Sequence, residues 1–173
     1  MKTVLCSLTL LLFGLYPLAA TADLTPEELA AEPPPADATF DDYAHLVPEA
    51  PDGAISWSLL GSVDEVAEVV NGTSHIRPEF PDEIKALHGN KIRIKGFIYP
   101  MQNSEEMDEF LLTALPPSCP YCLPAGAGYL METHTSKPLR FTWDAIVLEG
   151  TFEILENDPY GLYYRLDNAR QVK

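Results

Sequence analysis

The sequence predicts a mainly β protein whose folded part is a small OB-like barrel of about five strands with one short helix. Three observations predict this class. The 16 prolines among 173 residues are nearly twice the roughly 5% of average composition, which disfavours a helical bundle. Several short segments alternate apolar and polar side chains with period two. Gly96 interrupts the clearest of them, as glycines do where small barrels turn corners. An open sandwich is the alternative.

The first 22 residues have the pattern of a secretory signal peptide. An apolar run from Val4 to Leu18 precedes the small residues Ala20-Thr21-Ala22, which suit a signal peptidase. The run is shorter than the ~20 residues of a spanning helix. We therefore expect cleavage after Ala22, delivery to the periplasm and no membrane insertion afterwards.

Residues 23–53 are rich in alanine, acid and proline, including the triple Pro33-Pro34-Pro35. Proline at this density interrupts regular structure, so we expect an extended, solvated tail. The barrel domain is then residues 54–173.

Two elements precede the main strands. Residues 62–70 are ambiguous, because Ser62 with Glu65 resembles a helix capping box while Asn71-Gly72 is typical of a hairpin turn. We favour the hairpin. Residues 81–87 predict a short helix with Ile84 on its buried side and Gly89 as its end.

Residues 91–99 form the clearest strand, with Ile92, Ile94 and Ile98 on one face and cations on the other. The other predicted strands lie at 109–115, ended by Pro116-Pro117, at 129–135, within 140–155, and at 162–166 after a turn at 157–161.

The charge excludes one common ligand of OB barrels. The chain carries 11 Lys+Arg against 26 Asp+Glu, a net charge of -15, so its field repels phosphate. Nucleic acid binding needs a cationic groove, and we expect none. No phosphate loop, nucleophile elbow or HExxH motif occurs, which leaves hydrolase and kinase chemistry without support.

The pair Cys119-Pro120-Tyr121-Cys122 is the strongest chemical signal. Two thiolates at this spacing can bind one zinc or copper ion, and His134 on the following strand is the expected third ligand. Candidates for a fourth ligand are Glu132, His75 and His88, with Met101, Met107 and Met131 for copper(I).

Two other chemistries stay open for the same pair. A thiol-disulfide oxidoreductase needs a helix after the cysteines, which Pro124, Gly126 and Gly128 oppose. A structural disulfide needs only an oxidising compartment and would clip a non-enzymatic interaction module. We expect a periplasmic metal-binding or metal-delivery accessory protein that is not an enzyme.

Residues 89–98 with Pro100, the segment Glu109-Phe110-Leu111-Leu112, and a cysteine in a proline-rich loop together resemble a family of secreted bacterial proteins of unknown function. The resemblance covers about residues 80–172 and includes strands at 145–150 and 163–166. It implies an OB-like core and, because family members often stand beside metal-related transport systems, transport components as partners.

The chain departs from that family at its cysteine loop. Many members carry Cys-x-His before a run of prolines, whereas Cys119 here is followed by Pro120-Tyr121-Cys122. Only Cys119 carries over, with Cys122 as our inferred replacement ligand, since thiolate and imidazole both bind zinc and copper.

Overall fold

The computed structural model describes residues 40–70, 72–117 and 126–173. All the described residues belong to one compact unit, Ala38–Lys173. The predicted signal peptide and the cysteine loop lie outside the described residues.

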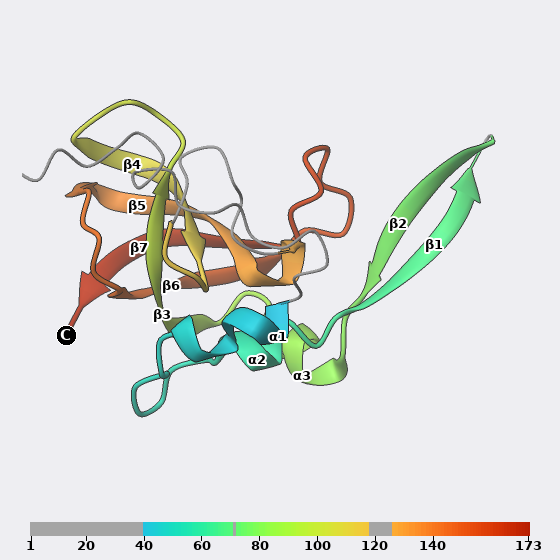
Figure 1. Cartoon of the computed structure of the whole chain (residues 1–173), viewed down its shortest axis with the longest axis horizontal. Coiled ribbons are helices and arrows are strands. Elements are labelled where there is room, and N and C mark those ends of the chain that lie inside the picture. Colours follow the sequence, from blue (N-terminus) through green and yellow to red (C-terminus); the bar gives the residue numbers. More distant parts are fainter. Residues whose placement is uncertain (1–39, 71, 118–125) are drawn as a thin grey trace, which may run out of the picture. The chain divides into compact units, whose positions relative to one another are not determined.

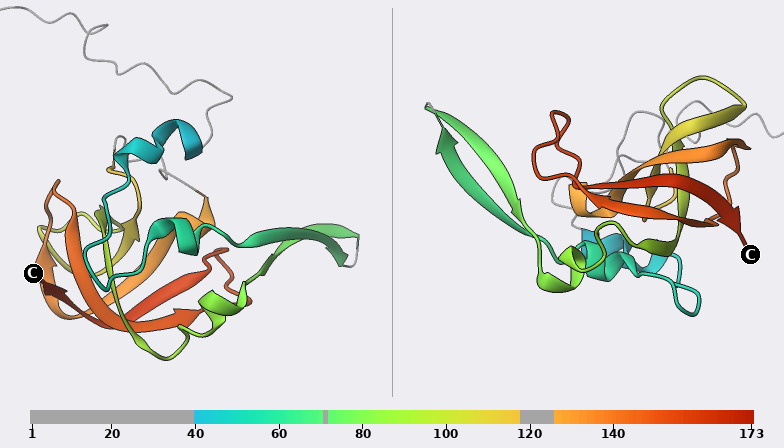
Figure 2. Two further views of the ribbon diagram at one scale, coloured as in Figure 1. Left: turned by 90° about the horizontal axis from the view of Figure 1, so that it is seen from below. Right: turned by 180° about the vertical axis from the view of Figure 1, so that it is seen from behind.

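Five strands close into a barrel in the order β3-β4-β5-β7-β6 (Figure 1). Their pairing is antiparallel except between β5 and β7, which run parallel. This confirms the predicted OB-like barrel, and Figure 2 shows its curvature from two further sides. The strands are β3 (Lys91–Pro100), β4 (Glu106–Thr113), β5 (Leu130–Arg140), β6 (Ile146–Ile154) and β7 (Tyr164–Val172).

The barrel interior is filled by the apolar side chains of alternating strand positions. On β3, Ile92, Ile94 and Ile98 are buried while Lys91 and Arg93 are exposed, as the period-two pattern predicts. The largest fully buried side chains include Tyr164, Phe110, Phe152, Met131, Leu112, Leu148 and Leu166.

Gly96 marks the point where β3 changes its partner. β3 pairs with β6 up to Gly96 and with β4 from Phe97 onward. A Cβ at Gly96 would lie 2.8 Å from the carbonyl oxygen of Thr113 and 2.9 Å from Cγ of Leu112, closer than van der Waals contact allows. A Cβ at Gly150 on β6 would likewise lie 2.8 Å from the carbonyl oxygen of Asp167. Both glycines therefore permit close strand crossing.

The helix α2 (Trp57–Leu60) packs against this corner. Ser56 caps it by accepting a hydrogen bond from the Leu59 amide at 3.3 Å. The indole of Trp57 is buried and donates to the carbonyl oxygen of Lys95 at 2.7 Å. The buried Tyr164 hydroxyl donates to the Leu60 carbonyl at 2.7 Å. Hydrogen bonds thus tie α2 to two separate strands.

Residues 40–46 form helical turns where an extended tail was expected. They comprise α1 (Phe40–Tyr43) and the 3-10 helix η1 (Ala44–Leu46). The ring of Phe40 stacks on Tyr129 with centroids 3.6 Å apart, and Phe40 and Val47 pack against the core. The acidic, proline-rich composition does not reveal this contact because Tyr129 is distant in the sequence.

The ambiguous segment is the predicted hairpin, β1 (Asp64–Val70) with β2 (Thr73–Glu79). Val70 pairs with Thr73, and Gly72 has φ of 81°, a left-handed value that favours glycine. The hairpin forms a two-stranded sheet of its own beside the barrel (Figure 1). The helix α3 (Asp82–Lys85) then follows, with Ile84 buried as predicted. It is shorter than the predicted 81–87, and Gly89, at φ of 75°, ends the turn that comes after it.

Several strand ends differ from the sequence prediction. β4 begins at Glu106 rather than residue 109, and β7 continues to Val172 rather than ending at 166. The end of β7 has mostly polar side chains, so its strand character comes from pairing with β6.

Glu149 on β6 accepts hydrogen bonds from Arg93 at 2.9 Å and from Arg170 at 2.6 Å. These bonds, Arg170 foremost, lower the pKa of Glu149 to about 2.

We predict that Gly96→Ala destabilises the barrel by about 1–3 kcal/mol, the usual cost of inserting a carbon into packed structure. Urea denaturation measures the change. Gly126→Ala is the matched control, because a Cβ there meets nothing within 4 Å, and its stability should change by less than about 0.5 kcal/mol. Equal midpoints for the two variants would contradict the close crossing.

We also predict that Tyr163 titrates late, together with Tyr164, whose pKa burial also raises. Burial first, and then the 2.8 Å hydrogen bond from its hydroxyl to Glu65, raise the pKa of Tyr163 to about 12. A raised pKa stabilises the fold fully below the unfolded value of about 10, and this contribution is lost as the pH rises toward 12. Tyrosinate absorbance measures the step. Tyr163→Phe should remove one late tyrosine and Glu65→Gln should lower its pKa partway, whereas an unchanged late phase in Tyr163→Phe would refute the assignment.

Candidate functional site

His134 is the one proposed metal ligand among the described residues, since Cys119 and Cys122 lie outside them. It occupies the outer wall of the barrel, because Met131 and Thr133 of the same strand are buried inside. Its Nδ1 lies 2.8 Å from Oδ1 of Asp167. The parallel pairing of β5 with β7 brings these two side chains together.

The second ring nitrogen of His134 faces another carboxylate. Nε2 lies 3.6 Å from Oε1 of Glu132, which is longer than a hydrogen bond. Glu132 accepts instead from Nε of Arg165 at 2.6 Å, and Glu153 lies 4.0 Å from the same guanidinium. The hydrogen bond from Arg165 to Glu132 is the largest cause of the raised pKa of Arg165. We call these four residues, with Asp167, the outer-wall network.

The outer-wall network is half-buried. The side chain of His134 is 36% exposed, Asp167 28% and Glu132 21%, so the ring can be reached from solvent while its carboxylate partners are partly shielded. Screening by water is weaker at such positions than on an open surface. The network can therefore hold the ring in one orientation.

The bond to Asp167 determines which nitrogen of the neutral ring carries the proton. An ionised carboxylate only accepts hydrogen bonds, so Nδ1 must donate. Nε2 then keeps its lone pair, which is the form that binds metal ions. A histidine oriented by a carboxylate in this way is the usual arrangement of metal-ligating histidines.

The described residues do not form a complete metal site by themselves. Among residues 40–70, 72–117 and 126–173, no three histidine, cysteine or carboxylate side chains are placed to hold one ion. The two cysteines of the predicted site lie outside this part of the chain.

The other candidate ligands lie elsewhere or are already engaged. Met107 and Met131 are buried in the barrel core, on the opposite side of the wall from His134, so they are not available to it. Met101 is 47% exposed in the turn after β3. His88 accepts the amide hydrogen of Ile154 with Nδ1 at 3.1 Å. For His75 the structure gives only its backbone position in β2.

Sequence reasoning missed Asp167 and Arg165 as members of this site. Arg165 and Asp167 alternate with buried residues of β7, but this pattern was a weak signal because the predicted strand ended at Leu166, before Asp167. The parallel pairing of β5 and β7 brings these two residues to β5, and no local sequence pattern predicts that pairing.

Comparison with known proteins gives one structural likeness. No family model matches the chain, and no curated protein matches it. A crystal structure of a DUF3299 family protein from Pseudomonas aeruginosa PAO1, at 2.45 Å resolution, matches with a TM-score of 0.44 and 20% identity. The match covers 73% of this chain and 88% of that one. Within the described part of the chain, no helix has both the length and the apolar character needed to cross a membrane.

We predict that the neutral imidazole of His134 is protonated at Nδ1. Nitrogen-15 chemical shifts distinguish the two ring nitrogens, and His134→Gln identifies the signals. Asp167→Asn should abolish the preference for Nδ1, because an amide does not fix the donor direction as a carboxylate does. Asp144→Asn, an exposed carboxylate in the turn before β6, is the control and should leave the signals unchanged. A wild-type ring protonated mainly at Nε2 would contradict the geometry.

Proposed function

We propose that this protein is a periplasmic, non-enzymatic metal-binding or metal-delivery accessory protein that uses Cys119, Cys122 and His134 as ligands for zinc or copper. One observation carries the proposal. The 2.8 Å contact between Nδ1 of His134 and Asp167 orients the ring and leaves Nε2 as a ligand nitrogen. The resemblance of residues 80–172 to secreted proteins beside metal-related transport systems supports such systems as partners.

Glu132 is the closest further ligand candidate, with Oε1 3.6 Å from Nε2 of His134. Its other oxygen accepts from Arg165 at 2.6 Å. That charged hydrogen bond makes Glu132 a weaker metal ligand, because a metal ion would compete with the Arg165 guanidinium for the same carboxylate. Two thiolates and one imidazole are accordingly the main ligands, and thiolates favour zinc and copper(I) over hard cations.

Calorimetric titration of the reduced protein with zinc tests the proposal. We expect one equivalent to bind. Cys119→Ser and Cys122→Ser should abolish tight binding, whereas His134→Ala should weaken it without removing it, because both thiolates remain. Asp167→Asn should weaken it about 10- to 100-fold through the loss of ring orientation, and Asp144→Asn should have no effect.

The pH dependence gives a second readout. Thiolate and neutral imidazole ligands must release protons on binding, so affinity should fall as the pH decreases. Unchanged binding in Cys119→Ser would refute the site. A fully oxidised pair with no metal uptake, found by thiol counting on protein from its native compartment, would instead identify the disulfide-clipped interaction module. Reduction of disulfide substrates without metal uptake would identify the oxidoreductase.

A further inference from the structure

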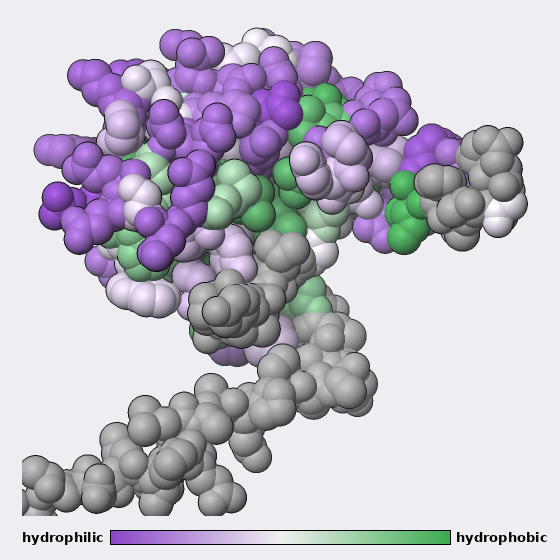
Figure 3. Space-filling view, turned by 90° about the horizontal axis from the view of Figure 1, so that it is seen from above, coloured by the Kyte–Doolittle hydropathy of each residue, from purple (hydrophilic) through white to green (hydrophobic). Residues whose placement is uncertain are grey.

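The β1–β2 hairpin presents an apolar face to solvent. Ala67 pairs with Ile76, and Val69 lies two residues from Ala67, so the side chains of Val69 and Ile76 share one face of the hairpin. Val69 is 74% exposed and Ile76 is 62% exposed. In Figure 3 apolar surface is visible on the hairpin. A two-stranded sheet with such a face is marginal in water unless something packs on it.

A groove at the base of the hairpin shares Ile76 with this face. One hollow of about 360 Å³ lies between β2 and the segment 155–163, and its apolar lining includes Ile76, Pro78 and Leu162. A neighbouring hollow of about 640 Å³ shares Pro78 and Glu156 with it. Ile76 thus belongs both to the exposed face and to the groove. We call the two together the hairpin groove.

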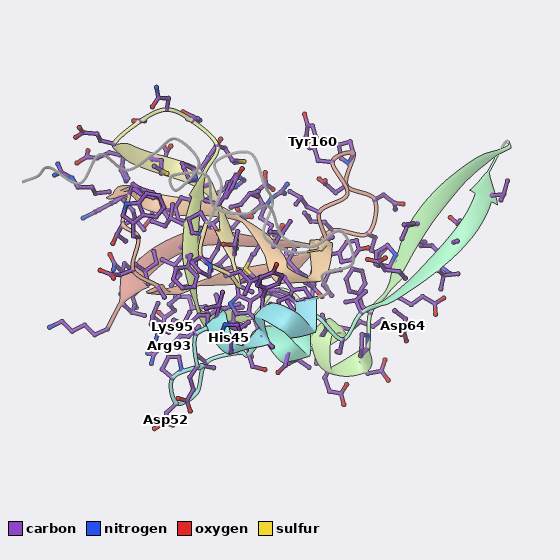
Figure 4. All side chains as sticks on the ribbon, viewed as in Figure 1. His45, Asp52, Asp64, Arg93, Lys95 and Tyr160 are labelled. Atoms are coloured by element: carbon purple, nitrogen blue, oxygen red, sulfur yellow. The ribbon has the colours of Figure 1, made fainter. Side chains whose placement is uncertain are left out.

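Tyr160 stands at the edge of this region. It is 88% exposed in the segment between β6 and β7 and points away from the barrel (Figure 4). The amides of Tyr160 and Leu162 both donate to Oδ2 of Asp158, at 2.8 and 3.1 Å. These bonds fix the backbone of the segment, so this wall of the groove is preformed.

The rim of the hairpin groove is acidic. Glu68 lines the smaller hollow and Asp64 and Glu79 line the larger one. The cations among the lining residues are Arg77, in both hollows, and Lys85, in the larger one. That arginine is already engaged, at 2.8 Å from Glu79 and 3.5 Å from Glu68.

The segment opposite the hairpin adds Glu156 and Asp158 to the same rim. With a net charge of -15 for the chain, a second copy of this surface is repelled and a basic partner is attracted.

We propose that the hairpin groove binds an extended, positively charged segment of a partner protein. Apolar side chains of that segment cover Val69 and Ile76 and enter the groove beside Leu162. Its basic side chains meet the acidic rim, Glu156 and Asp158 included. An extended segment places alternate side chains on opposite sides, so the preferred sequence alternates apolar and basic residues. This inference does not depend on metal binding.

Three fluorescein-labelled peptides of eight residues test the proposal by fluorescence anisotropy. The first alternates lysine and valine, the second has the same composition in two blocks, and the third alternates glutamate and valine. We expect the first to bind at least tenfold more tightly than the third and at least threefold more tightly than the second. Equal binding of the first two would reduce the interaction to charge attraction and overturn the proposal.

Protein variants locate the binding on the hairpin. Val69→Thr and Ile76→Thr keep a β-branched side chain and hence the strand preference, and each should weaken binding of the first peptide at least fivefold. Met101→Thr is the matched control, because Met101 is 47% exposed after the far end of β3, and it should bind as the wild type does.

Charge variants and the oligomeric state complete the test. Glu156→Gln should weaken binding of the first peptide and reduce the salt dependence of that binding. Asp144→Asn should change neither. Wild-type affinity in both threonine variants would overturn the proposal. So would a wild-type dimer in sedimentation that Ile76→Thr dissociates, since the occupant would then be a second copy of this chain.

Discussion

The barrel depends on the crossing of β3 between two partners at Gly96. The first half of β3 pairs with β6 and the second half with β4, and the chain can change partners there because the position has no Cβ to strike the carbonyl of Thr113. Closure removes the free edges that a five-stranded sheet would otherwise expose. Trp57 then packs over the crossing and donates its indole hydrogen to Lys95, so α2 is held by the same corner.

Closure also creates the outer-wall network. In the closed barrel β5 and β7 are parallel neighbours, and their outward-facing side chains contact one another. His134 thereby faces Asp167, and Glu132 faces Arg165. Each group is partly shielded from water, where charged hydrogen bonds are stronger than on an open surface. A fixed imidazole with one free nitrogen is the result, and it is the feature on which the proposed metal site rests.

The two proposed sites use different residues and different physics. The outer-wall network holds one nitrogen ligand in place by charged hydrogen bonds. The hairpin groove instead combines exposed apolar side chains with an acidic rim, which suits a protein partner better than an ion. A metal-delivery protein needs both a ligand set and a way to recognise its partner, so the two proposals are compatible, although either can fail alone.

The sequence by itself determined the elements whose signals are local. Alternation at Ile92, Ile94 and Ile98 identified β3, Asn71-Gly72 identified the hairpin, and the pattern around Ile84 identified the short helix α3, because each depends on neighbouring residues. That His134 is a metal ligand stays a prediction. The tertiary structure alone decided that Phe40 stacks on Tyr129, that polar residues after Leu166 form a strand, and that Asp167 orients His134. Those contacts join residues far apart in the sequence, and only the closure of the barrel brings them together.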